Sequence, residues 1–318
     1  MKNVPYLTTR KKTSNHMQLN ILITGSNGQL GNEMRKILKE NDSFNTFYTD
    51  KEELDISNRN VVEEFIITNK IDYIINCAAY TAVDLAEDNI EIARTINHMA
   101  VENLGIAAHK AKAKVIHIST DYVFDGTSCI PYSEEDNTNP QSVYGTTKLD
   151  GEKVLSKIIP NDHIIIRTAW LYSIYGKNFV KTMLNLGKTK DCLNVVADQI
   201  GTPTYAGDLA NAIYQIISSE KWIPGIYHFT NEGVCSWYVF TKTIHKIAGI
   251  TNCIVQPIST EEYPSKAKRQ AYSVLNKSKI KQIYGIKIPY WVDSLEKCIN
   301  ELNQDLKYYN CGKFNIRN

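Results

Sequence analysis

The 318-residue sequence lacks several features, and each absence excludes a class of protein. No apolar run approaches the roughly 20 residues of a membrane-spanning helix, so we expect no membrane partner. The net charge is only +2, from 36 basic and 34 acidic residues, which gives no reason to expect nucleic-acid binding. The seven cysteines include no CxxC pair, so we expect reduced thiols in a cytoplasmic protein, with neither disulfides nor a bound metal.

The remaining composition is that of a globular protein. Hydrophobic residues make up 43% of the chain and charged residues 22%, which suits one large or two medium domains. Residues 1–17 are polar and basic and lack the apolar stretch of a signal peptide. We expect this segment to be a disordered extension.

The first half of the chain alternates short apolar runs with amphipathic stretches. The apolar runs do not alternate with polar residues, which is typical of strands buried on both faces of a parallel sheet; they are 19–24, 71–76, 115–119 and 163–167. Helical periodicity separates them, at 29–40, 58–69, 90–110 and 144–156. This order predicts an α/β fold with a Rossmann-like doubly wound parallel sheet, and ligands at the carboxyl ends of its strands.

After about residue 175 the pattern becomes less regular. Helices are predicted at 177–188, 205–219, 236–248 and 290–302, between loops rich in Pro, Gly, Thr and Tyr. We assign 18–175 to the Rossmann-like domain and 176–303 to a smaller α+β substrate-binding lobe, with part of 195–219 packing back on the first domain and 304–318 as a tail. Because no Gly/Ser linker joins the lobes, we expect a cleft between them.

A glycine-rich loop, TGSNGQLG (24–31), follows the first predicted strand and opens a predicted helix. Gly25 permits a tight turn, Gly28 lets the backbone approach a pyrophosphate, and Gly31 lets the helix pack close to the strand. The free N–H groups of the helix then face the anion. We predict that this loop, Asn27 included, binds a nicotinamide dinucleotide; the alternative is an ordinary glycine-rich turn.

The next apolar stretch, 44–49, ends at Asp50. A carboxylate there can accept hydrogen bonds from an adenosine ribose, which favours NAD, or it can be an ordinary loop acid. The choice between NADPH and NADH therefore stays open. Asp55 and Ile56 follow closely, and we place them beside the adenine.

Three Tyr-x-x-x-Lys pairs occur in the chain: Tyr144/Lys148, Tyr238/Lys242 and Tyr309/Lys313. With 19 tyrosines, roughly two are expected by chance, so the spacing alone is a weak signal. Only the first pair follows both the glycine loop and a strand that ends in Ser-Thr-Asp (119–121), where side chains should project into the cleft. Context therefore selects Tyr144 and Lys148, which share one helix face.

This pair suggests a proton donor for carbonyl reduction. A free tyrosine titrates near ~10, and we expect the Lys148 ammonium to draw the pKa of Tyr144 down. Lys148 can also bind the nicotinamide ribose, and Thr120 can hydrogen-bond the substrate oxygen. Together they describe hydride transfer from a nicotinamide to carbon and proton transfer from Tyr144 to oxygen.

The combination of motifs resembles the dTDP-4-dehydrorhamnose reductase family of extended short-chain dehydrogenase/reductases. The motifs are GSNGQLG (25–31), NCAAYTAVDLAE (76–87), STDYVFDGT (119–127), PYSEEDNTNPQSVYGTTKLDGEK (131–153), RTAWLY (167–172) and DQIGTPTY (198–205). The resemblance covers roughly 18–302. It implies NADPH- or NADH-dependent reduction of the C4 ketone of dTDP-4-dehydro-β-L-rhamnose, in polysaccharide biosynthesis.

The resemblance also implies roles for particular residues. Those that would touch the cofactor are Gly28, Gln29, Leu30, Ala78, Ala79 and Tyr80. Those that would touch the substrate are Thr120, Asp121, Tyr144, Trp170, Asp84 and Arg269, the last at the diphosphate. Trp170 has a core position as its alternative, and Asp84 has an ordinary helix N-terminal role. Gln270 stands where family members often have proline, which bears on the shape of the loop around Arg269.

Some relatives dimerise through a cation held by carboxylates. Glu33 matches one such position, but Gly207 stands where another acid is needed, so we expect no metal and a monomer or weak homodimer.

Two rival functions share the same motifs. The first is a nucleotide-sugar 4,6-dehydratase or 4-epimerase; the dehydratases typically place Asp-Glu after the strand-end Thr, whereas Tyr122 follows Asp121 here. The regulatory β subunit of methionine adenosyltransferase binds a dinucleotide without reducing a sugar.

Overall fold

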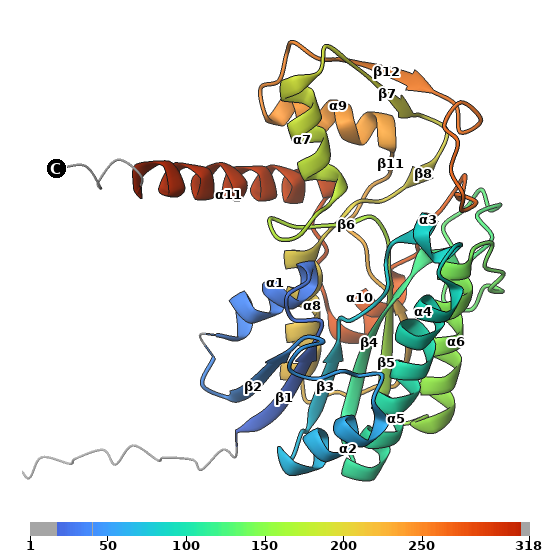
Figure 1. Ribbon diagram of the computed structural model, residues 1–318, viewed down its shortest axis with the longest axis vertical. Coiled ribbons are helices and arrows are strands. Elements are labelled where there is room, and N and C mark those ends of the chain that lie inside the picture. The colour runs from blue at the N-terminus through green and yellow to red at the C-terminus, as the bar shows by residue number, and fades with distance from the viewer. Residues whose placement is uncertain (1–17, 40, 313–318) are drawn as a thin grey trace, which may run out of the picture.

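The structure is a computed structural model that describes residues 18–39 and 41–312. The predicted extension, residues 1–17, lies outside the described residues. Six parallel strands form the central sheet in the order β10-β5-β4-β3-β1-β2 (Figure 1). They are β1 (Leu19–Thr24), β2 (Phe44–Thr49), β3 (Tyr73–Asn76), β4 (Lys114–Thr120), β5 (His163–Thr168) and β10 (Gly225–His228).

Helices cover both faces of this sheet, so the predicted α/β doubly wound class is confirmed. One face packs against α1 (Gln29–Leu38), α8 (Ala206–Ser218) and α10 (Ser278–Tyr284), and the other against α2 (Arg59–Thr68), α5 (Ala100–Ala111) and α6 (Val143–Ile158). Successive strand residues face opposite layers: Ile164 and Ile166 belong to the first core and Ile165 to the second. The apolar runs are therefore unbroken because both faces are buried.

The direction of winding reverses at β1, which has β2 on one side and β3 on the other. In such sheets the loops that follow the two strands at the reversal leave a crevice for a ligand. Here these loops touch: a Cβ on Gly25 would lie 2.7 Å from the Cα of Ala78. Gly25 also has φ +62°, the left-handed region that favours glycine. The fold thus brings the glycine loop and the Ala78 loop together.

A smaller layer lies beyond one end of the sheet, at the top of Figure 1. Its strands pair as β6 (Leu171–Tyr172) with β9 (Thr204–Tyr205), β7 (Cys192–Val196) with β12 (Ile254–Ile258), and β8 (Ile200–Gly201) with β11 (Cys235–Ser236). Its helices are α7 (Phe179–Thr189), α9 (Trp237–Ile247) and α11 (Trp291–Gly312). A largely aromatic core that includes Tyr172, Phe240 and Trp291 holds them together.

Several elements differ from their predicted positions. The predicted helix at 290–302 runs on to Gly312, since no Gly or Pro precedes Gly312 to end it, and the assignment of 304–318 to a tail stays a prediction. The predicted helix at 90–110 is broken into α4 (Ile90–Arg94), a π-helical turn (Thr95–Met99) and α5. The strand β10 and the helix α10 were not predicted, being four and seven residues long.

The two predicted lobes interleave along the chain. Both β10 and α8 fall within 176–303, yet β10 pairs with β5 in the central sheet and α8 shares a core with α1. We therefore propose that the substrate-binding lobe is made by only part of 176–303.

Over the described ranges, none of the helices is sufficiently long and apolar to cross a bilayer. Within the same residues, no cluster of three or more His, Cys, Asp or Glu side chains is placed to hold a metal ion.

Candidate active site

The glycine loop leaves the N-terminus of α1 open. Gly28 is the N-cap residue, no side chain caps the helix, and its first turn carries no acid. The Gly28 N–H donates to the Gly25 carbonyl at 3.0 Å, which closes the turn. A Cβ on Gly31 would stand 2.5 Å from both the Gly25 carbonyl oxygen and the Cα of Ser26, so helix and loop are in close contact. These features fit a bound pyrophosphate.

Replacing Gly31 with alanine is expected to push α1 away from the loop, because the atoms that the new methyl group meets are backbone atoms. We expect a loss of about 1–3 kcal/mol in the free energy of unfolding and a rise in the dissociation constant for NADPH. Urea titration and fluorescence titration measure the two effects.

Gly105→Ala is the matched control. Gly105 lies on α5, and its added methyl group would meet the flexible side chain of Leu155 at 3.2 Å, away from the loop. It should leave cofactor binding unchanged. Equal NADPH affinity in Gly31→Ala and the unaltered chain would contradict the role given to Gly31.

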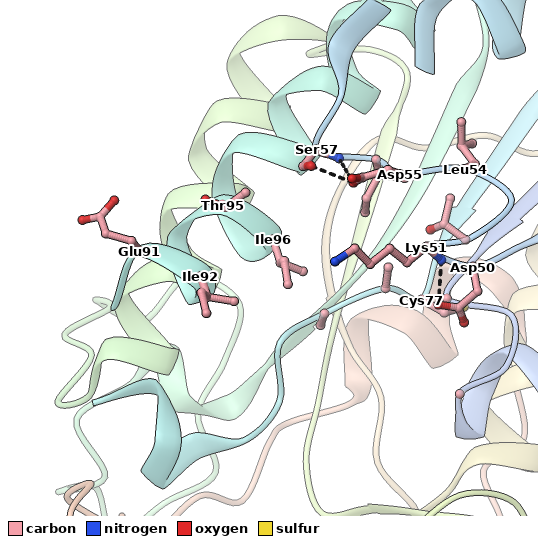
Figure 2. Close-up of a pocket in the computed structure, with 16 residues that line it drawn as sticks. Asp50, Lys51, Leu54, Asp55, Ser57, Cys77, Glu91, Ile92, Thr95 and Ile96 are labelled. Carbon is pink, nitrogen blue, oxygen red and sulfur yellow. Dashed lines mark hydrogen bonds between the residues drawn. The ribbon is translucent and has the colours of Figure 1, made fainter. Parts of the chain in front are cut away.

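A cavity of about 540 Å³ lies beside the loop (Figure 2). Its walls come from the segments that follow β1, β2 and β3 and from α4 with the π-helical turn. Predicted cofactor residues that line it are Gly25, Gly28, Asp50, Asp55, Ile56, Ala78 and Ala79. Together with Leu54, Ile92 and Ile96, Ile56 forms an apolar slot that suits a flat adenine ring.

Three predicted cofactor residues line neither this cavity nor the one next to it. Gly31 packs against the loop, as described above. The N–H of Asn27 donates to the Asp50 carboxylate at 3.2 Å. The N–H of Tyr80 donates to the Asn97 side chain at 2.9 Å, and the Asn97 amide donates back to the Tyr80 carbonyl at 3.1 Å. These three residues shape the loops rather than facing the space.

A second cavity of about 550 Å³ adjoins the first and shares Gly25, Gly28, Cys77 and Ala79 with it. Its lining brings together the remaining predicted site residues except Asp84, namely Gln29, Leu30, Thr120, Asp121, Tyr144, Lys148, Trp170 and Arg269. Tyr238 and Lys242, on α9, do not line it, and the Tyr309/Lys313 pair lies outside the described side chains. The two cavities form one elongated site with Tyr144 and Lys148 in the second.

Tyr144 stands in the first turn of α6. The helix is capped by Ser142, whose hydroxyl accepts from the Gly145 N–H at 3.1 Å. The Tyr144 ring packs edge-on against Tyr122, with 5.5 Å between centroids. Burial raises the pKa of Tyr144 above its ordinary value, and the neighbouring Thr120 hydroxyl only partly offsets this. The predicted lowering of the pKa by Lys148 is absent, because burial outweighs every other influence.

Lys148 is fully buried one turn further along α6. Its ammonium donates to the Ile118 carbonyl at 2.6 Å and lies 3.3 Å from Nε2 of His117. Burial lowers the pKa of Lys148 to about 8, against the attraction of Glu152. The same burial, with the Lys148 charge nearby, holds the pKa of His117 well below its usual value. The lysine is thus fixed in place by the β4 strand.

Asp121 has an unpaired oxygen in the cavity wall. One carboxylate oxygen accepts from the Thr120 hydroxyl at 2.9 Å, while the other is buried without a hydrogen-bond partner in the described chain. Burial raises the pKa of Asp121 to about 6. The Thr120 hydroxyl and Ser273, which also acts on this carboxylate, partly offset the rise. The neighbouring Ser119 also lines the cavity, and its hydroxyl donates to Glu152.

Trp170 lines the second cavity and has a left-handed backbone, with φ +49°. Its ring stacks on Trp237, with 3.5 Å between centroids. Trp237, the first residue of α9, lines the cavity too and was not among the predicted site residues. In the sequence Trp237 is a single aromatic residue at the start of a helix. Core residues often occupy such a position too, so no local pattern identifies Trp237 as a site residue.

Arg269 and Asp84 are paired with each other. The Arg269 guanidinium donates to Asp84, on α3 (Val83–Ala86), and to the Tyr122 hydroxyl at 2.8 Å. Asp84 also accepts from the Ala267 N–H at 3.1 Å, and does not line the cavity. Gln270, which replaces the family's proline, donates to the carbonyls of Asp121 and Phe124. Gln270 therefore fixes the loop that presents Arg269 to the cavity.

Comparison with known proteins gives a consistent set of relatives. The chain matches the RmlD substrate binding domain family over residues 19–304. It is 44% identical to the dTDP-4-dehydrorhamnose reductase of Aggregatibacter actinomycetemcomitans over 87% of this chain and 97% of that protein. The crystal structure of a dTDP-4-dehydrorhamnose reductase from Clostridium acetobutylicum is 45% identical, with a TM-score of 0.86 over 90% of this chain and all of that one.

A third relative carries a bound dinucleotide. The dTDP-4-dehydrorhamnose reductase of Bacillus anthracis, solved in complex with NADP, is 39% identical to this chain. Its TM-score is 0.86, and the match covers 90% of this chain and 100% of that one.

Proposed function

The chain belongs to the dTDP-4-dehydrorhamnose reductase family, and from this premise we propose that it reduces the C4 ketone of dTDP-4-dehydro-β-L-rhamnose to give dTDP-L-rhamnose. One observation carries the proposal: Thr120, Tyr144 and Lys148 line a cavity that continues into the glycine loop. The enzyme is an oxidoreductase that uses NADPH or NADH. When bound, this cofactor supplies the hydride.

Tyr144 is the proton donor in this proposal. Reduction of a ketone develops negative charge on its oxygen, and an alkoxide is a far stronger base than a phenolate. The raised pKa of Tyr144 keeps its hydroxyl protonated at neutral pH, which is the state that a donor requires. Thr120 lies next to Tyr144, and in the proposal it assists by turning its hydroxyl proton from Asp121 to the ketone oxygen.

Lys148 holds the cofactor end of the cavity. The Ile118 carbonyl and His117 fix its position, so the ammonium needs no rearrangement when a ribose hydroxyl is presented to it. A preorganised charge of this kind stabilises developing negative charge more effectively than a mobile one. We assign Lys148 to ribose binding and to stabilisation of the Tyr144 oxygen as it loses its proton.

The remaining walls suit a nucleotide sugar. Asp121 lines the cavity, where its carboxylate can accept from a sugar hydroxyl, and the stacked pair Trp170 and Trp237 offers an aromatic face. Arg269 can reach a diphosphate from the cavity rim, with Asp84 holding it in position rather than binding substrate itself. This reading keeps the predicted role of Arg269 and changes that of Asp84.

The two rival functions receive less support. Dehydration needs an acid and a base in addition to the tyrosine. The residue after Asp121 is Tyr122, which has no carboxylate to serve as that base and accepts a hydrogen bond from Arg269. A purely regulatory dinucleotide-binding subunit has no need of a buried lysine one turn from a cavity-facing tyrosine. We place the protein in the cytoplasm as a monomer or weak homodimer with no nucleic-acid or membrane partner, in accord with its free thiols at six described cysteines.

A panel of nucleotide-linked 4-keto sugars, each offered with NADPH and with NADH, tests the proposed function. Oxidation of the cofactor on mixing with dTDP-4-dehydro-β-L-rhamnose, faster than with UDP-linked or C4-hydroxyl analogues, is the expected result. No oxidation with any member of the panel, under conditions in which the dinucleotide binds, would favour the regulatory alternative.

A further inference from the structure

A lysine crosses the cavity beside the glycine loop. Lys51 follows β2 directly, and Figure 2 shows its side chain extending across the cavity with the ammonium far from its own backbone. It is the only cationic side chain among the described residues that line this cavity, whereas three carboxylates do so. No salt bridge involves Lys51 in the part of the chain that the structure describes.

The nearest carboxylates already have hydrogen-bond donors. The two oxygens of Asp50 accept from the backbone N–H groups of Asn27, at 3.2 Å, and Lys51, at 2.8 Å. One oxygen of Asp55 accepts from both the N–H and the hydroxyl of Ser57, and these bonds, with a smaller contribution from the Lys51 charge, hold the pKa of Asp55 below its usual value. Asp50 therefore fixes the glycine loop to the end of β2, and the Lys51 ammonium remains available.

The position of Lys51 identifies the ligand group that it faces. The catalytic pair lies in the second cavity, so a dinucleotide bound with its nicotinamide there has its adenosine in the cavity of Figure 2. In this fold the 2′ oxygen of the adenosine ribose lies at the end of β2, where an acid selects a free hydroxyl and a nearby cation accommodates a phosphate. Lys51 occupies that place.

We propose that the Lys51 ammonium binds the 2′-phosphate of NADPH, and so makes NADPH the preferred cofactor of the protein. The inference rests on the proposed function only in taking the ligand to be a nicotinamide dinucleotide. It assigns Asp50 to the support of the loop, and not to selection of NADH. A charge-assisted contact of this kind discriminates between two dinucleotides that differ by one phosphate.

Cofactor binding without any sugar tests the proposal directly. We expect Lys51→Ala to raise the dissociation constant for NADPH about 10- to 100-fold and to leave that for NADH within about twofold, as loss of one charge-assisted contact implies. Lys51→Glu should raise the dissociation constant for NADPH further. Lys153→Ala, which removes an exposed lysine on α6, is the matched control and should change neither constant.

Competition with nucleotide fragments provides a second readout that is independent of turnover. Adenosine 2′,5′-bisphosphate should displace NADPH from the unaltered protein at lower concentration than 5′-AMP does, and Lys51→Ala should abolish the difference. The assignment would be overturned if Lys51→Ala weakened the binding of NADPH and NADH equally, or weakened the binding of neither. A preference of the unaltered protein for NADH would also overturn it. Failure of the unaltered protein to bind either dinucleotide would instead overturn the proposed function.

Discussion

Tyr144→Phe is expected to lower kcat about 10²-fold or more while the fold and the affinity for NADPH stay the same, because the variant loses only the proton donor. The ring keeps its edge-on packing against Tyr122, since that contact involves no hydroxyl group. Stopped-flow measurement of NADPH oxidation with the keto-sugar gives the rate, and fluorescence titration gives the affinity.

Tyr238→Phe is the matched control for this experiment. Tyr238 has the same spacing to a lysine, Lys242, but lies on α9 away from both cavities. The control should retain full turnover. Unimpaired turnover in Tyr144→Phe, or an equal loss in both variants, would remove Tyr144 from the reaction.

Lys148→Met is expected to affect binding and turnover together. Methionine is linear and fills similar space, but it cannot donate to the Ile118 carbonyl or present a charge to the ribose. We therefore expect a raised dissociation constant for NADPH and a fall in kcat of about 10²-fold or more. Burying the unpaired carbonyl also costs about 1–3 kcal/mol in the free energy of unfolding, which urea titration measures.

Lys242→Met, on the exposed side of α9, is the corresponding control and should change none of these quantities. A Lys148→Met protein that unfolds at lower urea concentration but turns over normally would show that Lys148 is structural only. A loss of kcat with unchanged NADPH affinity would confine its role to the proton transfer.

The strands and the glycine loop could be predicted because local sequence determines them. Residues such as Ile164, Ile165 and Ile166 are apolar without interruption, since the sheet is covered on both faces. Gly25 is needed because its φ is positive, and Gly31 because a side chain there would collide with the loop backbone. Both needs follow from a tight strand–loop–helix turn. Tyr144 and Lys148 share a face because four residues make one helical turn.

Other features depend on contacts between distant segments, which spacing does not encode. The sequence offered no sign that Asp84 pairs with Arg269, 185 residues away, or that Trp237 stacks on Trp170. The predicted direction of the pKa change at Tyr144 was wrong for the same reason: burial, which depends on the packing around the side chain, raises the pKa, and the spacing to Lys148 does not encode that burial.

Transfer of deuterium from the cofactor to the sugar tests the central claim most directly. NADPH labelled at either prochiral position of nicotinamide C4 is incubated with the protein and dTDP-4-dehydro-β-L-rhamnose, and the product is analysed by NMR. The account predicts one deuterium at C4 of the rhamnose from one of the two labelled cofactors. A product without deuterium at C4 from either label, or no product at all, would contradict it.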